Sequence, residues 1–196
     1  MDTRINLVEF REKEHEYWYN DGRRLIRLHG VTTPIGKLLK KNFPDNLTVQ
    51  LATIHGHDVH HESEMWIKKG EEPFSVSGKW LVSYLKEFAL KYNITRFSAE
   101  LKVSDFIGTA SCIDVVAHSD EGDYLFDIKT TSEFHREYCS LQLSVYKTLY
   151  EAVYERTVKG LFVLGTKSQR AFKIIEQPSV RVDKILDMNK SKEALK

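Results

Sequence analysis

The chain has 196 residues, of which 41% are hydrophobic and 11% aromatic, and this composition predicts one globular core and argues against bulk disorder. Its 29 basic and 28 acidic residues almost cancel, so any nucleic-acid partner would have to be held by a local basic groove or through metal ions. The two cysteines, Cys112 and Cys139, form no metal-binding pair, and no apolar run is long enough for a membrane span or a secretion signal, so we expect a cytoplasmic protein.

The first part of the chain predicts a small lobe over residues 1–48. Asn20-Asp21-Gly22 separates two short apolar runs, His15–Tyr19 and Leu25–Leu28, which is typical of a β-hairpin. Thr33 followed by Pro34 predicts a helix start, with Thr33 as the cap and Pro34 in the first helical position.

Hydrophobic periodicity then predicts a core over residues 49–177 and a C-terminal helix or tail over residues 178–196. The expected helices are Val49–Lys69, Trp80–Ala89, Glu137–Tyr154 and the weak Val180–Lys196. The expected strands are Phe97–Val103, Ile107–Ala117, Tyr124–Lys129, Gly160–Gly165 and Ala171–Ile175. This order predicts an α/β (α+β) fold, with a central mixed β-sheet flanked by helices.

Charged residues interrupt two of the apolar strands. If Tyr124–Lys129 is a strand, Asp127 and Lys129 share one face with Leu125. Asp114 lies between apolar neighbours in the preceding strand, where a buried carboxylate is costly unless it is paired or bound to a metal. A hairpin would bring Asp114 beside Asp127, and a divalent cation would relieve their repulsion. The alternatives are a solvated edge strand, or an ion pair between Asp114 and Lys129 without chemistry.

Two predicted helices add further candidates. Gln142 and Tyr146 are four residues apart and share a helix face, although packing in the core would explain them equally well. In the other helix, His57, His60 and Glu64 lie close to one another and allow a zinc site, although most such clusters are solvated surface.

Several ordered motifs together resemble one family. The motifs are Gly56-x-x-x-His60-x-x-x-Glu64, Ser98-Ala99-Glu100-Leu101, Gly108 followed by Asp114, Asp127-Ile128-Lys129-Thr130-Thr131, and Gln142-x-x-x-Tyr146. In this order they resemble the PD-(D/E)XK nucleases of the RecB-like and phage-exonuclease branch. The cysteine set of the iron–sulfur members is missing. Gly108 is further from Asp114 than the tightest family pattern has it.

The resemblance implies a restriction-endonuclease-like core and metal-dependent hydrolysis of DNA. Of the nuclease activities, it favours that of an exonuclease. It implies Mg²⁺ or Mn²⁺ ligands at His60, Asp114, Asp127 and the carbonyl of Ile128. It also implies a catalytic set of Asp114, Asp127, Lys129, Glu64, Gln142 and Tyr146, with Glu100 as possible support. The partner would be DNA, together with a recombination partner protein in phage or bacterial DNA processing.

Two other functions stay open at this point. The first is a non-catalytic nucleic-acid-binding protein on the same fold. The second is a zinc hydrolase built on His57, His60 and a carboxylate. For DNA contacts outside the metal site, the densest basic region comprises Arg23, Arg24, Arg27, Lys37, Lys40 and Lys41. Trp66, Trp80 and Tyr84 could stack on bases, although aromatic residues at helical spacing usually belong to a core.

Overall fold

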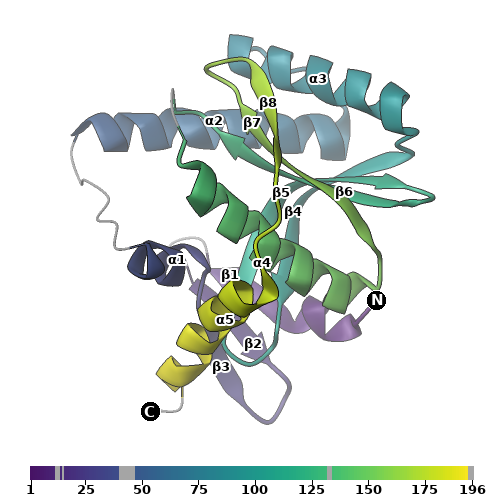
Figure 1. Cartoon of the computed structure of the whole chain (residues 1–196). Coiled ribbons are helices and arrows are strands. Elements are labelled where there is room, and N and C mark those ends of the chain that lie inside the picture. The colour runs from purple at the N-terminus through teal and green to yellow at the C-terminus, as the bar shows by residue number, and fades with distance from the viewer. Residues whose placement is uncertain (12–13, 15, 40–46, 132–133, 194–196) are drawn as a thin grey trace.

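A computed structural model describes residues 1–11, 14, 16–39, 47–131 and 134–193, and within these ranges the side chains of 47–57 and 191–193 are not described. The described residues form a three-stranded sheet, a five-stranded sheet and five α-helices, as Figure 1 shows. The larger sheet is mixed and has helices on both faces, so the predicted fold class is confirmed.

The N-terminal part of the chain forms an antiparallel sheet of its own. It contains a short 3₁₀ helix, Thr3–Leu7, and the strands β1 (Val8–Arg11), β2 (Glu16–Asn20) and β3 (Leu25–Leu28). The predicted β2–β3 hairpin is present, and Asp21 Oδ1 accepts the N–H groups of Arg23 and Arg24 at 2.9 and 2.8 Å, which fixes the turn. The sequence did not predict β1, because its four residues include both Glu9 and Arg11 and leave too short an apolar pattern.

Helix α1 (Thr32–Leu38) begins two residues earlier than the sequence predicts. Its N-cap is Val31, which makes no side-chain cap, so the prediction of Thr33 as the cap was wrong. Pro34 therefore stands third in the helix and not first. The N–H groups of the whole first turn have no partner within the helix, so proline is tolerated at this position as well.

One face of the larger sheet is covered by α2 (Leu47–Lys69) and α3 (Val76–Tyr92). The loop between them is fixed by a buried carboxylate. Ser75 Oγ accepts the N–H of Gly78 at 2.9 Å, as a helix cap does, and donates to Glu62 Oε2 at 2.7 Å. Glu62 thus joins the start of α3 to the side of α2.

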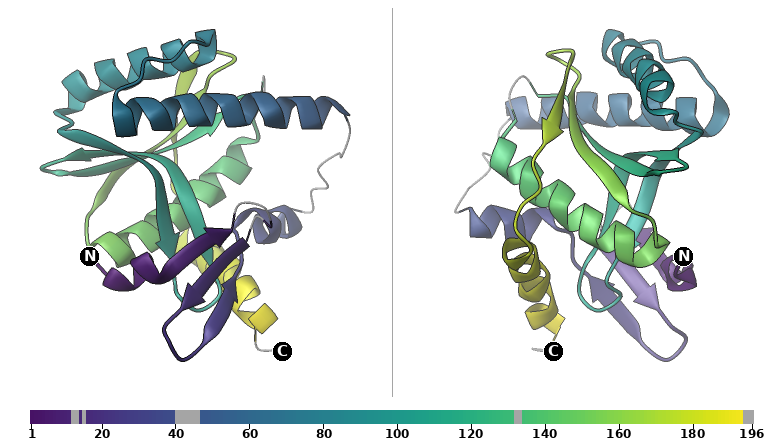
Figure 2. Two further views of the ribbon diagram at one scale, coloured as in Figure 1. Left: turned by 180° about the vertical axis from the view of Figure 1, so that it is seen from behind. Right: turned by 45° about the vertical axis from the view of Figure 1, so that its right-hand side comes forward.

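The five strands are β4 (Arg96–Ser104), β5 (Ala110–Ser119), β6 (Gly122–Lys129), β7 (Val158–Gly165) and β8 (Arg170–Ile174). They lie in chain order, and all neighbours are antiparallel except β6 and β7. Because parallel strands need a crossover, α4 (Arg136–Tyr154) connects these two across the face opposite α2 and α3, as the two views of Figure 2 show. Helices α1 and α5 (Ser179–Glu193) pack on the same face as α4.

The faces of β6 are those that the sequence predicts. Leu125 is buried against α4, whereas Phe126 and Ile128 are buried against α2 and α3. Asp127 and Lys129 consequently lie on the α4 side of the strand.

Strand β5 begins at Ala110, later than the predicted Ile107, because an aspartate builds a turn before it. Asp105 Oδ1 accepts the N–H groups of Ile107, Gly108 and Thr109 at 2.8–3.0 Å. Their N–H groups are therefore not free to pair with β4, and Thr109 forms only an isolated bridge, with His29.

The same turn is the place where α5 docks. Asn189 is fully buried, and its Nδ2 lies 3.3 Å from the carbonyl oxygens of His29 and Gly30 and 3.2 Å from Thr109 Oγ1. A Cβ on Gly108 would lie 2.9 Å from the backbone nitrogen of Lys190. Gly108 is thus needed for the close approach of α5, whatever its resemblance to a nuclease motif.

We expect Gly108→Ala to lower the free energy of unfolding by about 1–3 kcal/mol, because the added methyl group meets backbone that cannot move aside cheaply. Urea unfolding measures this change. Gly30→Ala is the matched control, since its Cβ would meet only Thr32 Oγ1, at 3.9 Å. Equal stabilities of the two variants would contradict the packing role of Gly108.

A buried charged cluster lies near the turn that joins β5 and β6. Asp123 is fully buried and accepts hydrogen bonds from Tyr150 at 2.6 Å and from Arg156 at 2.6 and 2.9 Å. His118 Nδ1 lies 3.1 Å from Asp123 Oδ1, and its Nε2 is 2.9 Å from Ser98 Oγ. Burial lowers the pKa of His118, Arg96 and Arg156 lower it further, and Asp123 opposes them without reversing the direction.

This shift makes folding depend on pH. The unfolded chain takes up a proton at His118 near pH ~6.5, whereas the folded protein does so only at lower pH. Stability should therefore fall as the pH decreases through this window. In His118→Gln, we expect the unfolding midpoint to fall less than that of the wild type between about pH 7.5 and about pH 5. Parallel curves in thermal unfolding would show that His118 does not contribute.

Within the described ranges, no helix combines the length and the apolar character that crossing a bilayer requires.

Candidate metal centre

The site lies where strands β5 and β6 separate. Their ladder ends at the pair Val115 and Phe126, after which β6 continues with β7 and β5 continues with β4. Asp114 occupies the fork. Its Oδ2 accepts the N–H of Ile128 at 2.6 Å, and this bond takes the place of the missing ladder bond.

Strand β4 brings a second carboxylate to the fork through an irregular residue. Ala99 pairs with Val115 and Leu101 pairs with Ile113, so Glu100 is left out between them. Its φ of 50° lies in the left-handed region, a conformation that costs a residue other than glycine about 1–3 kcal/mol. The strain is placed at a residue whose carboxylate belongs to the cluster.

His60 reaches the fork from α2. Its Nδ1 lies 3.7 Å from Asp114 Oδ1 and 3.9 Å from Glu100 Oε1. One ligand atom from each of these three residues lies within 4.8 Å of the others. Burial lowers the pKa of His60, but Asp114 and Glu100 outweigh burial and raise that pKa to about 9.

Asp127 and Lys129 complete the fork from β6. Asp127 is only 2% exposed, and Lys129 Nζ lies 2.9 and 2.8 Å from its two carboxylate oxygens. Burial raises the pKa of the Asp127 carboxyl, and Lys129 opposes this. Burial likewise raises the pKa of Asp114, against His60. Asp114 also raises the pKa of Asp127, and Glu100 raises the pKa of Asp114, so an added positive charge would stabilise the ionised carboxylates.

Behind Lys129, a chain of polar contacts enters α4. Lys129 Nζ lies 3.5 Å from Gln142 Oε1, and Gln142 Nε2 donates to the hydroxyl of Tyr146 at 2.9 Å. Ser111 of β5 donates to the same hydroxyl at 3.1 Å. Burial raises the pKa of Tyr146, so its hydroxyl stays protonated. Gln142 therefore contacts Lys129 from the α4 side, and Tyr146 fixes the side chain of Gln142. Both residues are buried.

The fork thus gathers most of the predicted residues, namely His60, Glu100, Asp114, Asp127, Ile128 and Lys129, with Gln142 and Tyr146 behind them. Glu64 is directed elsewhere, because its carboxylate pairs with Lys68 at 2.5 Å and lies 4.0 Å from His61 Nδ1. The side chain of His57 lies outside the described residues. Ser111 was missed, since a serine in an apolar strand gives no signal of its own.

The donor set fits a divalent cation. Asp127 Oδ2 is a buried oxygen without a hydrogen bond among the described residues, although an ammonium group lies near it. Carboxylate oxygens and one imidazole nitrogen are common ligands of divalent metals. The cluster is therefore compatible with a divalent metal, whose identity the donors leave open.

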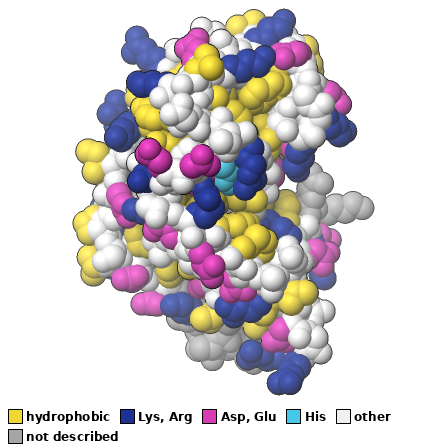
Figure 3. Space-filling view, turned by 90° about the vertical axis from the view of Figure 1, so that its right-hand side faces the viewer, with side chains coloured by type: hydrophobic (Ala, Val, Ile, Leu, Met, Phe, Trp, Pro, Cys, Tyr) yellow, Lys and Arg dark blue, Asp and Glu magenta, His cyan; other side chains and the backbone are white. Residues whose placement is uncertain are grey.

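The predicted DNA-contacting side chains lie mostly in other contacts. Trp66 packs against Phe97 with ring centroids 5.7 Å apart, and Trp80 stacks on Tyr84 at 5.8 Å. Lys40 and Lys41 lie outside the described residues. On the face that Figure 3 shows, Lys and Arg side chains are interspersed with Asp and Glu.

The sequence matches no protein-family model and no curated protein. Among solved structures, the chain is similar to a proposed exonuclease from Eubacterium rectale, with a TM-score of 0.39 and 11% identity, covering 82% of this chain and 70% of the other. It is also similar to the protein SSO0001, with a TM-score of 0.33 and 12% identity, covering 80% of this chain and 82% of the other. These scores carry no argument about chemistry. The molecule is defined by its own architecture, a mixed α/β protein with a histidine–carboxylate cluster at a strand fork.

Proposed function

We propose that the protein is a metal-dependent DNA nuclease of the PD-(D/E)XK type, acting as an exonuclease. One observation carries the proposal. Asp114, Asp127 and Lys129 meet at the fork of β5 and β6, and His60 and Glu100 close the same cluster. A buried carboxylate and a half-buried one with an adjacent ammonium group have little value for stability alone, because replacing such groups by apolar ones is often neutral or stabilising.

The reaction is hydrolysis of a phosphodiester, in which a water oxygen bonds to phosphorus and one ester oxygen leaves with a proton. Asp114 and Asp127 would hold the cation, with His60 and the carbonyl of Ile128 as further ligands, and Glu100 would support the site. A divalent cation supplies Lewis acidity toward the phosphate and lowers the pKa of water. Lys129 Nζ orients the attacking water and offsets the negative charge that develops on the phosphate.

Mg²⁺ or Mn²⁺ suits this donor set better than zinc does. The described cluster offers one imidazole and two carboxylates, with the carboxylate of Asp127 beside them, and oxygen-rich sites favour Mg²⁺ and Mn²⁺. An imidazole ligand moves the preference toward Mn²⁺. A zinc hydrolase on His57 and His60 would also leave Lys129 without a role. A binding protein without activity would gain nothing from the strained Glu100.

The substrate we propose is DNA, in phage or bacterial DNA processing or recombination, where a recombination protein would be a partner. The test is cleavage of linear and covalently closed circular DNA with Mn²⁺, repeated with a chelator. Loss of the linear DNA alone, prevented by the chelator, is the expected result. Cutting of the circle would make the protein an endonuclease, and intact DNA of both forms would contradict the proposal.

A further inference from the structure

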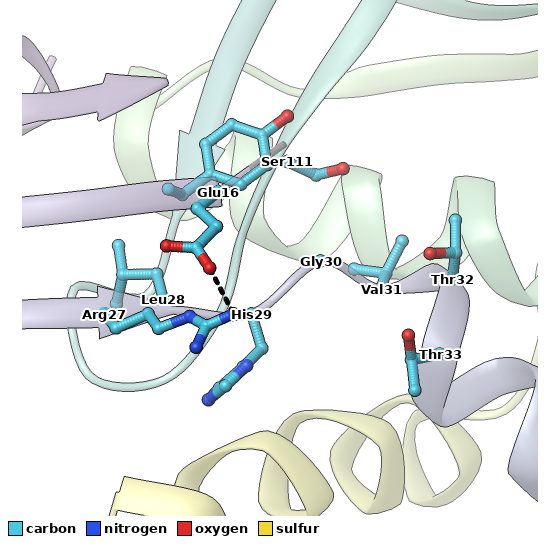
Figure 4. Close-up of a pocket in the computed structure, with 10 residues that line it drawn as sticks. Glu16, Arg27, Leu28, His29, Gly30, Val31, Thr32, Thr33 and Ser111 are labelled. Atoms are coloured by element: carbon cyan, nitrogen blue, oxygen red, sulfur yellow. Dashed lines mark ion pairs between the residues drawn. The ribbon is translucent and has the colours of Figure 1, made fainter. Parts of the chain in front are cut away.

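A pocket of about 200 Å³ lies between residues 16–33 and strand β5, and Figure 4 shows its lining. Glu16 and Arg27 line one side of it, and Thr32 and Thr33 line the other. Ser111 of β5 contributes from the core. The segment 16–33 therefore does more than cover the sheet, because it builds both of these walls of a polar pocket.

The pocket is connected to the metal centre. Ser111 Oγ donates to Tyr146, which is bonded to Gln142, and Gln142 contacts Lys129. Along β5, Ser111 precedes Asp114 by three residues, which corresponds to about 10 Å of strand. A group bound in the pocket would thus lie close enough for an attached phosphate to reach the carboxylates.

The lining determines what the pocket accepts. Arg27 Nη2 pairs with Glu16 Oε1 at 2.5 Å, so the guanidinium charge is already neutralised. Glu16 would also repel a free phosphate. The second oxygen of Glu16 accepts the indole N–H of Trp18 at 3.1 Å. Each oxygen keeps a further lone pair and the guanidinium keeps further N–H groups, so a donor and an acceptor lie side by side on the wall opposite Thr32 and Thr33. This is the pattern for a neutral ligand with several hydrogen-bonding groups, such as a nucleobase with its sugar.

We propose that this pocket receives the terminal nucleoside of a DNA strand, so that the phosphodiester next to it lies at the fork. The inference rests on the proposed nuclease function and deepens it, since it makes a free strand end part of the substrate. The volume supports a single nucleoside, because pockets for larger ligands measure about 300–1,000 Å³.

The test compares binding of two single-stranded oligonucleotides in the presence of a chelator. One carries an intact terminal nucleoside and the other an abasic sugar at that position with the same phosphates, and each end of the strand is tested in turn. We expect the wild type to bind one intact end about tenfold more tightly than its abasic form. In Thr33→Val and in Glu16→Gln, this ratio should fall to about threefold or less. Thr148→Val, on the exposed side of α4, is the control and should retain it.

The outcomes separate this inference from the proposed function. Equal binding of intact and abasic ends by the wild type would overturn the pocket's role, and cleavage of linear DNA would still uphold the nuclease. If the wild type distinguished intact from abasic termini but cleaved no DNA, the result would support the role of the pocket and contradict the nuclease function. An unchanged ratio in both pocket variants would also overturn the inference, since recognition would then lie elsewhere.

Discussion

Replacing Lys129 with alanine should lower the rate of phosphodiester cleavage by at least about a hundredfold, which is the usual cost of removing a group that stabilises developing charge. Lys129 Nζ lies within 2.9 Å of both oxygens of Asp127 and 3.5 Å from Gln142. No other ammonium group is placed in the fork among the described residues. Burial lowers the pKa of Lys129, but Asp127 outweighs burial and raises it above its ordinary value, so the group stays charged when it acts.

The measurement is a single-turnover cleavage rate with Mn²⁺ in excess. Lys173→Ala is the matched control, because this lysine is exposed on β8, away from the fork. Circular dichroism and binding of DNA in a chelator show whether the Lys129→Ala variant is folded. A folded variant whose cleavage rate is within about tenfold of the wild-type rate would contradict the role assigned to Lys129.

Asp114→Asn should lower the affinity for the divalent cation by at least about tenfold, since even changes outside the ligand set have effects of that size. The substitution tests the charge of Asp114 alone, because asparagine keeps an oxygen that can accept the N–H of Ile128, as Asp114 does at 2.6 Å. It removes the negative charge that balances the positive charges of Lys129 and His60. The fork should therefore stay folded while it binds the cation weakly.

Calorimetric titration with Mn²⁺ measures the change in affinity. Asp120→Asn supplies the control, because Asp120 is an exposed turn residue between β5 and β6. If Asp114→Asn and the wild type titrate alike, Asp114 does not hold the ion. Cleavage by the variant at the wild-type rate would lead to the same conclusion by an independent route.

The architecture could be predicted because the apolar pattern of the core agrees with its final packing. The alternation in Tyr124–Lys129 correctly places Leu125 on one face and Phe126 on the other. Helix α4 likewise begins one residue before its predicted start and ends where predicted. Helix α3 extends a few residues beyond the predicted range at both ends. The errors lie where side chains compete with the backbone, as Asp105 does before β5.

The geometry of the fork could not be predicted. Nothing in the residue pattern reveals that β5 and β6 separate after Val115, or that Glu100 adopts a left-handed conformation. Both depend on pairing between distant strands. The choice of His60 among several neighbouring histidines depends on how α2 lies over the sheet, which periodicity does not determine. The pocket beside Ser111 is even less accessible to sequence reasoning, because it forms between segments far apart in the chain.

Binding of a divalent cation at the fork underlies every role proposed for its residues. The most direct measurement is a crystal of the wild-type protein soaked in Mn²⁺, with anomalous diffraction used to locate the ion. We expect one strong peak at coordination distance, about 2 Å, from oxygens of Asp114 and Asp127 and a nitrogen of His60. An empty fork at saturating Mn²⁺, or an ion bound only elsewhere on the protein, would contradict it.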